Sequence, residues 1–180
     1  MPFAVRLSSP LALFRKLERE SYRAFHAPTP LHKADHFFNF CVTAASMRDY
    51  LLEHLNLLSD VQRKPHYDAW AKLPALVAAV EIANLSKHFV LRDKKTTQPK
   101  PVKTRTVRLK KAKFIDVYTN FDGDIKLVEN HKIEVTVTLS DGQSLELYAF
   151  TDQVIKYWKS YIASYGLRTR HQPFNRLAAR

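Results

Sequence analysis

Apolar residues recur at helical spacing through the first half of the chain. Three segments, at about Pro10–Phe25, Leu31–Leu58 and Pro74–Leu91, carry apolar side chains three and four residues apart, which predicts three amphipathic helices. Ser8 or Ser9 is a possible N-cap for the first of them, because a serine hydroxyl can accept a bond from an early helical N–H group. The segment Gln62–Tyr67 lacks this spacing, and we expect a loop there.

After residue 104 the spacing changes to two, which is typical of β-strands. Alternation predicts strands at about Arg105–Asn120, Ile125–Leu139 and Gln143–Phe150. Asp122-Gly123 and Asp141-Gly142 separate these runs, and Asp-Gly between alternating segments is a strong hairpin signal. The sequence therefore predicts a three-stranded antiparallel meander, which we expect to pack its apolar face on the helices.

Helical spacing returns at the end of the chain, where Asp152–Tyr165 predicts a last helix that stops at Gly166. The expected fold is α+β and mainly α: an antiparallel four-helix bundle with the β-meander inserted before the last helix. We expect one domain over residues 1–180. It divides into a three-helix core (8–92), a basic loop (93–104), the β-meander (105–150), a closing helix (151–166) and a basic tail (167–180).

Composition narrows the function classes. The chain of 180 residues contains only three glycines, and no glycine-rich phosphate loop is present. Its one cysteine, Cys41, fits a reducing compartment, and its position among aromatic residues predicts a buried thiol. No apolar run approaches the roughly 18 residues that cross a bilayer, so we expect a cytoplasmic protein that does not bind membranes. The histidines are scattered, and we predict neither a metal nor a cofactor.

The net charge of +12 is unevenly distributed. Nine Lys or Arg residues and no acid lie between Lys94 and Lys113, and no acid follows Asp152. Such a cluster is typical of nucleic-acid binding, although a solvated basic loop gives the same pattern. The candidate phosphate-binding residues are Lys94, Lys95, Lys100, Lys103, Arg105, Arg108, Lys110 and Lys111.

The end of the third predicted helix carries polar residues within an apolar segment. Glu81, Asn84 and His88 are three and four residues apart, so they lie on one face of a helix. Two readings stay open: the polar groups neutralise one another across the bundle, or they line a cleft in which His88 acts as a general acid or base. The second predicted helix adds Asp35, Asn39 and Asp49 on one face, which with Glu81 could form a polar seam.

These segments resemble the HEPN superfamily of small helical-bundle proteins. The resemblance rests on the helix Asp35–Leu58, with its Asp-x-x-x-Asn start and the segment Ser46–Asp49 (SMRD), and on the segment Glu81–Phe89 (EIANLSKHF). It covers roughly residues 8–92. Many members are metal-independent endoribonucleases of defence and toxin systems, and two chains pair to bring their motifs together.

The resemblance implies that His88 and Asn84 occupy the motif's histidine and polar positions. The motif's arginine, which would stabilise phosphate charge, is Ala83 here. Lys87, Arg92 or Arg48 could supply a replacement cation, and the expected catalytic set is His88, Asn84 and Lys87. A homodimer that acts on RNA rather than DNA would follow.

Two functional hypotheses result. The first is an RNA-directed, HEPN-like protein, either a ribonuclease or a catalytically weakened relative. The second is a non-catalytic module that dimerises through its helices and holds a protein or nucleic acid with the meander edge or the basic loop.

Overall fold

The computed structural model describes residues 7–85, 104–120, 122–139 and 141–168. Within them the chain forms five helices and one three-stranded antiparallel sheet of order β1-β2-β3. The protein is thus α+β and mainly helical, with the sheet inserted before the last helix, as the sequence predicts. The elements are α1 (Pro10–His26), α2 (Pro30–His54), α3 (Asp60–Trp70), α4 (Pro74–Leu85), β1 (Thr104–Thr119), β2 (Ile125–Leu139), β3 (Ser144–Glu146) and α5 (Leu147–Ala163).

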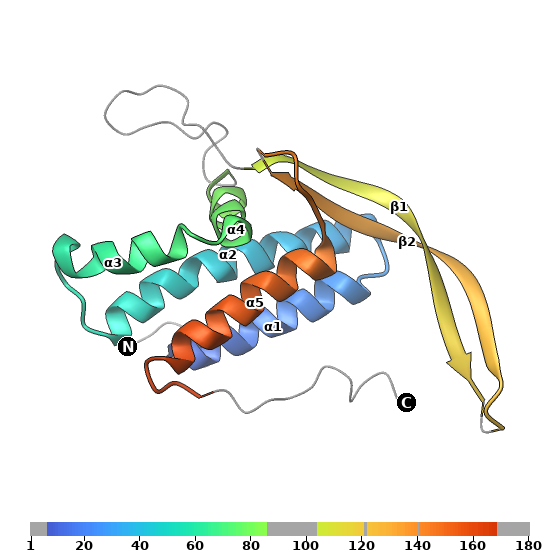
Figure 1. Ribbon diagram of the computed structural model, residues 1–180, viewed down its shortest axis with the longest axis horizontal. Helices are drawn as coiled ribbons and strands as arrows, with labels where there is room; N and C mark the ends of the chain where they lie inside the picture. Colours follow the sequence, from blue (N-terminus) through green and yellow to red (C-terminus); the bar gives the residue numbers. More distant parts are fainter. Residues whose placement is uncertain (1–6, 86–103, 121, 140, 169–180) are drawn as a thin grey trace.

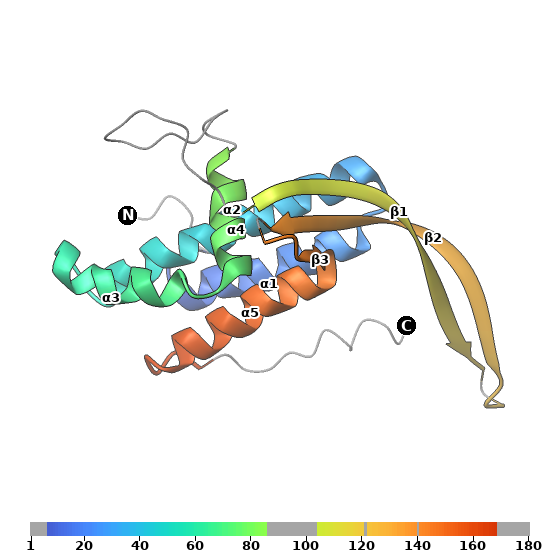
Figure 2. The same ribbon diagram turned by 45° about the horizontal axis from the view of Figure 1, so that its top comes forward.

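The helices α1, α2 and α5 run side by side, whereas α4 crosses them and α3 follows one end of α2 (Figures 1 and 2). Large apolar side chains from four of these helices are fully buried between them. They include Phe14, Phe40, Met47, Leu76, Phe150 and Trp158. Burial of these side chains stabilises the helical body, because each removes apolar surface from water.

Side-chain caps begin the first two helices. The Ser9 hydroxyl accepts the N–H of Ala12 at 3.2 Å, and the Thr29 hydroxyl accepts the N–H of His32 at 3.2 Å. A proline follows each cap and supplies a backbone angle suited to the first helical turn. The predicted first helix is confirmed to within one residue at its end.

The region after α2 differs from the prediction. The helix ends at His54 rather than near Leu58, because Asn56 adopts a positive φ of 52°. The expected loop over Gln62–Tyr67 is wrong, since α3 occupies it. A capping box explains this helix: the Ser59 hydroxyl accepts the Gln62 N–H, while the Gln62 side chain bonds back to the Ser59 N–H.

The third strand is shorter than predicted, and the last helix is longer. The strand expected over Gln143–Phe150 covers only Ser144–Glu146, and α5 begins at Leu147 instead of Asp152. The buried positions from this point are Leu147, Phe150, Thr151, Val154 and Trp158, a helical spacing. Alternating Leu145 and Leu147 imitates a strand at a place where the chain already turns into a helix.

Both Asp-Gly hairpins are confirmed. The N–H of Asn120 donates to the Asp124 carbonyl at 3.1 Å, and the N–H of Leu139 donates to the Gln143 carbonyl at 2.8 Å. Gly123 and Gly142 have φ values of 85° and 88°, which a residue with a Cβ adopts only with strain. The glycines therefore set the geometry of the two turns.

The strands β1 and β2 form a long, twisted hairpin, here called the β-arm (residues 104–139), that leaves the helices and curves into solvent (Figures 1 and 2). Only its near half packs on the helical body, through Val135, Val137 and Leu139. In its far half the apolar side chains are exposed; Ile115, for example, is 64% exposed. The meander therefore packs its apolar face on the helices, as expected, in its near half and not in its far half.

Candidate nucleic-acid interface

The expected catalytic residues lie at the edge of the described structure. Asn84 is half-buried in the last turn of α4, with Ala83 buried beside it. Glu81 is half-buried one turn earlier. Lys87, His88 and the alternative cation Arg92 lie outside the described residues. The described residues therefore give a position for Asn84 and Glu81 and no geometry for the set as a whole.

The polar residues of α2 point elsewhere. Asp35, Asn39 and Asp49 are all exposed, so they do not form a buried seam with Glu81. The reason is the width of the apolar surface of α2, which includes Phe37, Phe40, Cys41, Ala44, Met47, Leu51 and Leu52. That surface takes the sides of α2 that face other helices and leaves the acidic residues to solvent.

Arg48, which the structure does describe, is the third candidate replacement cation, and aromatic rings surround its guanidinium. Its guanidinium lies 4.9 Å from the Tyr67 ring centre and 5.5 Å from that of Trp70. The ring centre of Trp70 in turn lies 5.6 Å from that of Trp158 in α5. The Tyr161 hydroxyl, also in α5, is 2.9 Å from Nδ1 of His66. These contacts join α2, α3 and α5, so the aromatic residues serve packing, as does the cation.

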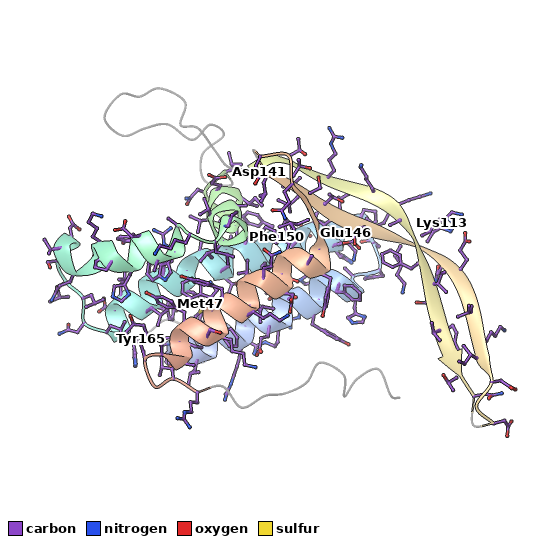
Figure 3. The ribbon with its side chains drawn as sticks, in the orientation of Figure 1. Met47, Lys113, Asp141, Glu146, Phe150 and Tyr165 are labelled. Carbon is purple, nitrogen blue, oxygen red and sulfur yellow. The ribbon has the colours of Figure 1, made fainter. Side chains whose placement is uncertain are left out.

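The near half of the β-arm presents a row of positive charge. Arg108, Lys110 and Lys111 are exposed, and no acidic group of the described residues lies within ion-pair distance of them. Successive strand residues point to opposite faces, so Arg108 and Lys110 lie on one face and Lys111 lies on the other. Lys113 continues the row at the bend of the arm, away from the helices (Figure 3). We call Arg108, Lys110, Lys111 and Lys113 the cationic row.

Several predicted phosphate-binding residues are not placed. Lys94, Lys95, Lys100 and Lys103 lie outside the described residues, as does the side chain of Arg105, whose backbone belongs to β1. Arg108, Lys110 and Lys111 are thus the members of the predicted set that the structure brings together.

The acid of the near half, Glu134, lies opposite Lys110 in the β1–β2 register, but its carboxylate bonds to the start of α5 instead of to a cation of the row. Its side chain is 6% exposed, and its Oε1 accepts the N–H of Leu147, the first residue of α5, at 2.8 Å. Burial raises the pKa of Glu134, and the Leu147 N–H and the Lys33 charge oppose that shift. The carboxylate therefore serves the start of α5 and leaves the surface charge of the arm in place.

Lys33 completes this buried polar contact. It is 3% exposed, and its Nζ donates to the carbonyl oxygens of Ala24 and Phe25, each at 2.9 Å, near the end of α1. Burial lowers the pKa of Lys33, while Glu134 raises it. Sequence reasoning missed both residues, because a charged residue in an alternating strand or an amphipathic helix is normally taken as exposed.

Charge differs between the two halves of the arm. Beyond Lys113 and Lys132, the arm carries Asp116, Asp122, Asp124 and Glu129 against the single cation Lys126. Two of these acids reach back to the cations next to them: Glu129 contacts Lys113 at 2.9 Å, and Asp116 contacts Lys132 at 2.9 Å. The excess of exposed positive charge therefore lies in the part of β1 nearest the helices.

Other candidate chemistry is limited in the part of the chain that the structure describes. There, no group of three or more His, Cys, Asp or Glu side chains is arranged to hold a metal ion. Cys41 is buried, as predicted, and burial raises the pKa of its thiol. Of the helices described, none has the length and apolar character needed to span a membrane.

Comparison with known proteins adds no relative: the chain matches no protein-family model, no curated protein and no solved structure.

Proposed function

We propose that the protein binds nucleic acid through the cationic row of its β-arm and acts there as a binding module. The proposal rests on the observation that three cations of the row lack acidic partners among the described residues. Arg108, Lys110 and Lys111 project into solvent without an acidic partner among the described residues, while Glu134 is directed into the protein.

Exposed cations without an acidic partner bind the phosphates of a nucleic-acid backbone readily. An exposed cation without a partner has no ion pair to break when it meets a polyanion, and each phosphate contact releases counterions. From Arg108 to Lys113 the strand extends about 17 Å, at roughly 3.4 Å per residue. That length is comparable with several successive phosphates of a nucleic-acid strand, which are spaced by about 3.4 Å along the axis of a duplex.

The HEPN resemblance favours RNA as the nucleic acid that is bound, and DNA is the alternative ligand. A two-stranded β-ribbon is also of a width that enters the major groove of B-DNA. The shape of the arm supports contact with either polymer, and the charges themselves select neither base sequence nor sugar.

The experiment compares salt dependence in two triple variants. In the first, Arg108, Lys110 and Lys111 are changed to Gln; in the control, the exposed Arg15, Lys64 and Lys72 of the helical region are changed to Gln. Both lose three positive charges, so a difference between them reports position. Binding to labelled single-stranded RNA and to duplex DNA is measured by fluorescence anisotropy over a range of salt concentrations.

For three lost phosphate contacts on a single strand, the slope of log K against log salt should become shallower by about 2. Wild-type affinity should then fall about 20-fold more than that of the arm variant when salt rises from about 50 to about 200 mM. The control variant should keep nearly the wild-type slope. Equal slopes in both variants, or absence of binding by the wild type, would refute the proposal.

An RNA-cleaving, HEPN-like site is the catalytic extension of this proposal. Asn84 at the end of α4 supports it, since the motif's polar position falls on a half-buried residue near the surface of the helical body. Ala83 opposes it, because a buried methyl group cannot stabilise a phosphorane charge. Binding without cleavage is therefore the function we favour, in an HEPN-like helical body that carries the arm.

A further inference from the structure

The outer edge of β1 is a long strand edge without a partner in the described structure. β1 lies at the edge of the sheet, and its 16 residues contain no proline. The pairing with β2 is regular from Thr106 to Thr119, with an irregularity only at Thr104/Thr106. Such an edge offers unpaired N–H and C=O groups to another strand.

Ladder geometry identifies the residues that offer those groups. Asn120 and Asp124 form a hydrogen-bonded pair at the turn, and hydrogen-bonded pairs alternate along an antiparallel ladder. The even-numbered residues of β1 therefore bond to β2, and the odd-numbered residues direct their N–H and C=O groups outward. The outward set runs from Val107 to Val117.

The same odd-numbered positions carry an apolar pattern that is symmetric about Ala112. Val107 and Leu109 are each 43% exposed, and Ile115 and Val117 are 64% and 61% exposed. An antiparallel second copy centred on Ala112 places Leu109 opposite Ile115 of that copy and Val107 opposite Val117. Each pair occurs twice, and directly opposed apolar pairs are the unit that stabilises a sheet.

The even-numbered positions are complementary in the same register. Arg108 falls opposite Asp116 of the second copy, which matches a cation with an anion on an exposed face. Asp116 already contacts Lys132 at 2.9 Å, and a carboxylate has acceptor capacity for a further donor. Lys110 falls opposite Phe114, a cation over an aromatic ring.

One pairing in this register is unfavourable. Lys111 falls opposite Lys113 of the second copy, and like charges repel. The repulsion is reduced because Lys113 holds Glu129 of its own arm at 2.9 Å. The two-fold axis repeats every pair, the Lys111–Lys113 pair included, so two apolar pairs and one ion pair stand against one pair of like charges on each side of the axis.

Antiparallel pairings of the two β1 strands that are centred one residue away from Ala112 give less favourable side-chain pairs. A centre on Lys113 places Ile115 opposite Lys111 and Val107 opposite Thr119. A centre on Lys111 places Leu109 opposite Lys113. Half-residue centres are excluded, since they would set an outward-bonding residue against one whose groups already bond to β2.

We infer that two copies of this protein pair through the outer edges of their β1 strands, antiparallel and with the two-fold axis at Ala112. The result joins the two sheets into one continuous sheet, with about 12 added backbone hydrogen bonds over residues 107–117. The arm extends clear of the helices, so this edge is available to a second copy (Figures 1 and 2). This inference does not depend on nucleic-acid binding. In the inferred dimer Arg108 gains Asp116 of the second copy as a partner, which leaves Lys110 and Lys111 as the cations of the row without an acidic partner.

A cysteine at the axis tests the register. In the inferred dimer the two copies of residue 112 form a non-hydrogen-bonded pair with Cα atoms about 4.5 Å apart, within the range of a disulfide. The chain has a single cysteine, Cys41, which is buried, so Ala112→Cys adds the reactive thiol. Under mild oxidation this variant should form a covalent dimer, seen on a non-reducing gel.

The matched control is Tyr118→Cys, on the same strand and face. Residue 118 lies opposite residue 106 of the second copy, so its own counterpart is about 40 Å away and cannot be reached. Rapid dimer formation by Ala112→Cys alone supports the inference. Equal cross-linking in the two variants, or none in Ala112→Cys, overturns it.

Molar mass provides a measurement without an introduced thiol. The wild type should scatter light as a particle of twice 20.9 kDa. Ile115→Lys should shift the equilibrium to the monomer, because the new charge opposes Leu109 of the second copy. Leu127→Lys, equally exposed at 64% but on β2, should remain a dimer. A monomeric wild type, or equal loss in both variants, contradicts the inference; neither measurement uses nucleic acid.

Discussion

Glu134→Ala tests whether the buried polar contact fixes the β-arm to the helices. The Glu134 carboxylate accepts the buried N–H of Leu147 at 2.8 Å and is the nearby negative charge for Lys33. Alanine would leave that N–H without its acceptor and Lys33 with only the two carbonyl oxygens of α1. The substitution therefore removes a contact between β2, α5 and the end of α1.

The expected cost follows from these two losses. A buried donor without a partner costs about 1–3 kcal/mol. With the lost charge beside Lys33, the free energy of unfolding should fall by about 2–3 kcal/mol. For a chain of this size the melting temperature should decrease by about 4–12 °C.

Tryptophan fluorescence in a urea titration measures this change, because Trp70 and Trp158 are both buried. The matched control is Glu146→Ala: Glu146 precedes the first turn of α5, is exposed and makes no side-chain cap bond (Figure 3). Its loss should change stability by less than about 0.5 kcal/mol. Equal effects of the two substitutions would refute the assigned role of Glu134.

The pH dependence of the free energy of unfolding provides an independent test of the burial of Glu134. Burial raises the pKa of Glu134 above its ordinary 4.5, so the folded state holds this proton more tightly than the unfolded state. The contribution of the group to stability is then fully present below 4.5 and is lost as pH rises through the folded pKa. Wild type should gain stability relative to Glu134→Gln as pH falls toward 4.5, and the opposite trend would contradict the burial argument.

Two further predictions concern α5 and the HEPN motif. Phe150→Ala removes a fully buried ring that lies 5.6 Å from Phe37, and it should lower the free energy of unfolding by about 3–5 kcal/mol; Tyr148→Ala, at a 68% exposed position, should have little effect. Comparable losses in urea titrations would argue against the helical start at Leu147. Purified wild type and His88→Ala should both leave RNA intact in the presence of EDTA; product formed by the wild type alone would establish the catalytic reading instead.

Local sequence signals predicted the elements that depend on local chemistry. Ser9 begins α1 where a capping residue precedes proline, and Gly123 and Gly142 form turns because positive φ favours glycine. Alternation gave the bounds of β2 as Ile125–Leu139, which the structure reproduces. The missed helix α3 also had a local signal, the Ser59/Gln62 capping box, which Pro65 obscured.

The candidate interface was predicted in part. Charge density along the sequence identified Arg108, Lys110 and Lys111. The structure places all three on one strand, with their side chains exposed to solvent. Whether a nearby acid would neutralise them could not be read from the sequence, since Glu134 looks like a solvent-facing residue of an alternating strand. Its inward direction depends on α5, whose first N–H group needs an acceptor.

The sequence by itself determined the class of this fold, its two hairpin turns and the location of its positive charge, because caps, turn glycines and periodicity act over a few residues. Tertiary structure decided where α5 begins, which polar side chains are buried and how much of the β-arm leaves the helical body. Those outcomes depend on contacts between segments far apart in the chain, such as Glu134 with Leu147 and Lys33 with the end of α1. Periodicity within one segment does not show which other segment packs against it. The assembled sheet, in contrast, shows that the outer edge of β1 has no partner strand among the described residues.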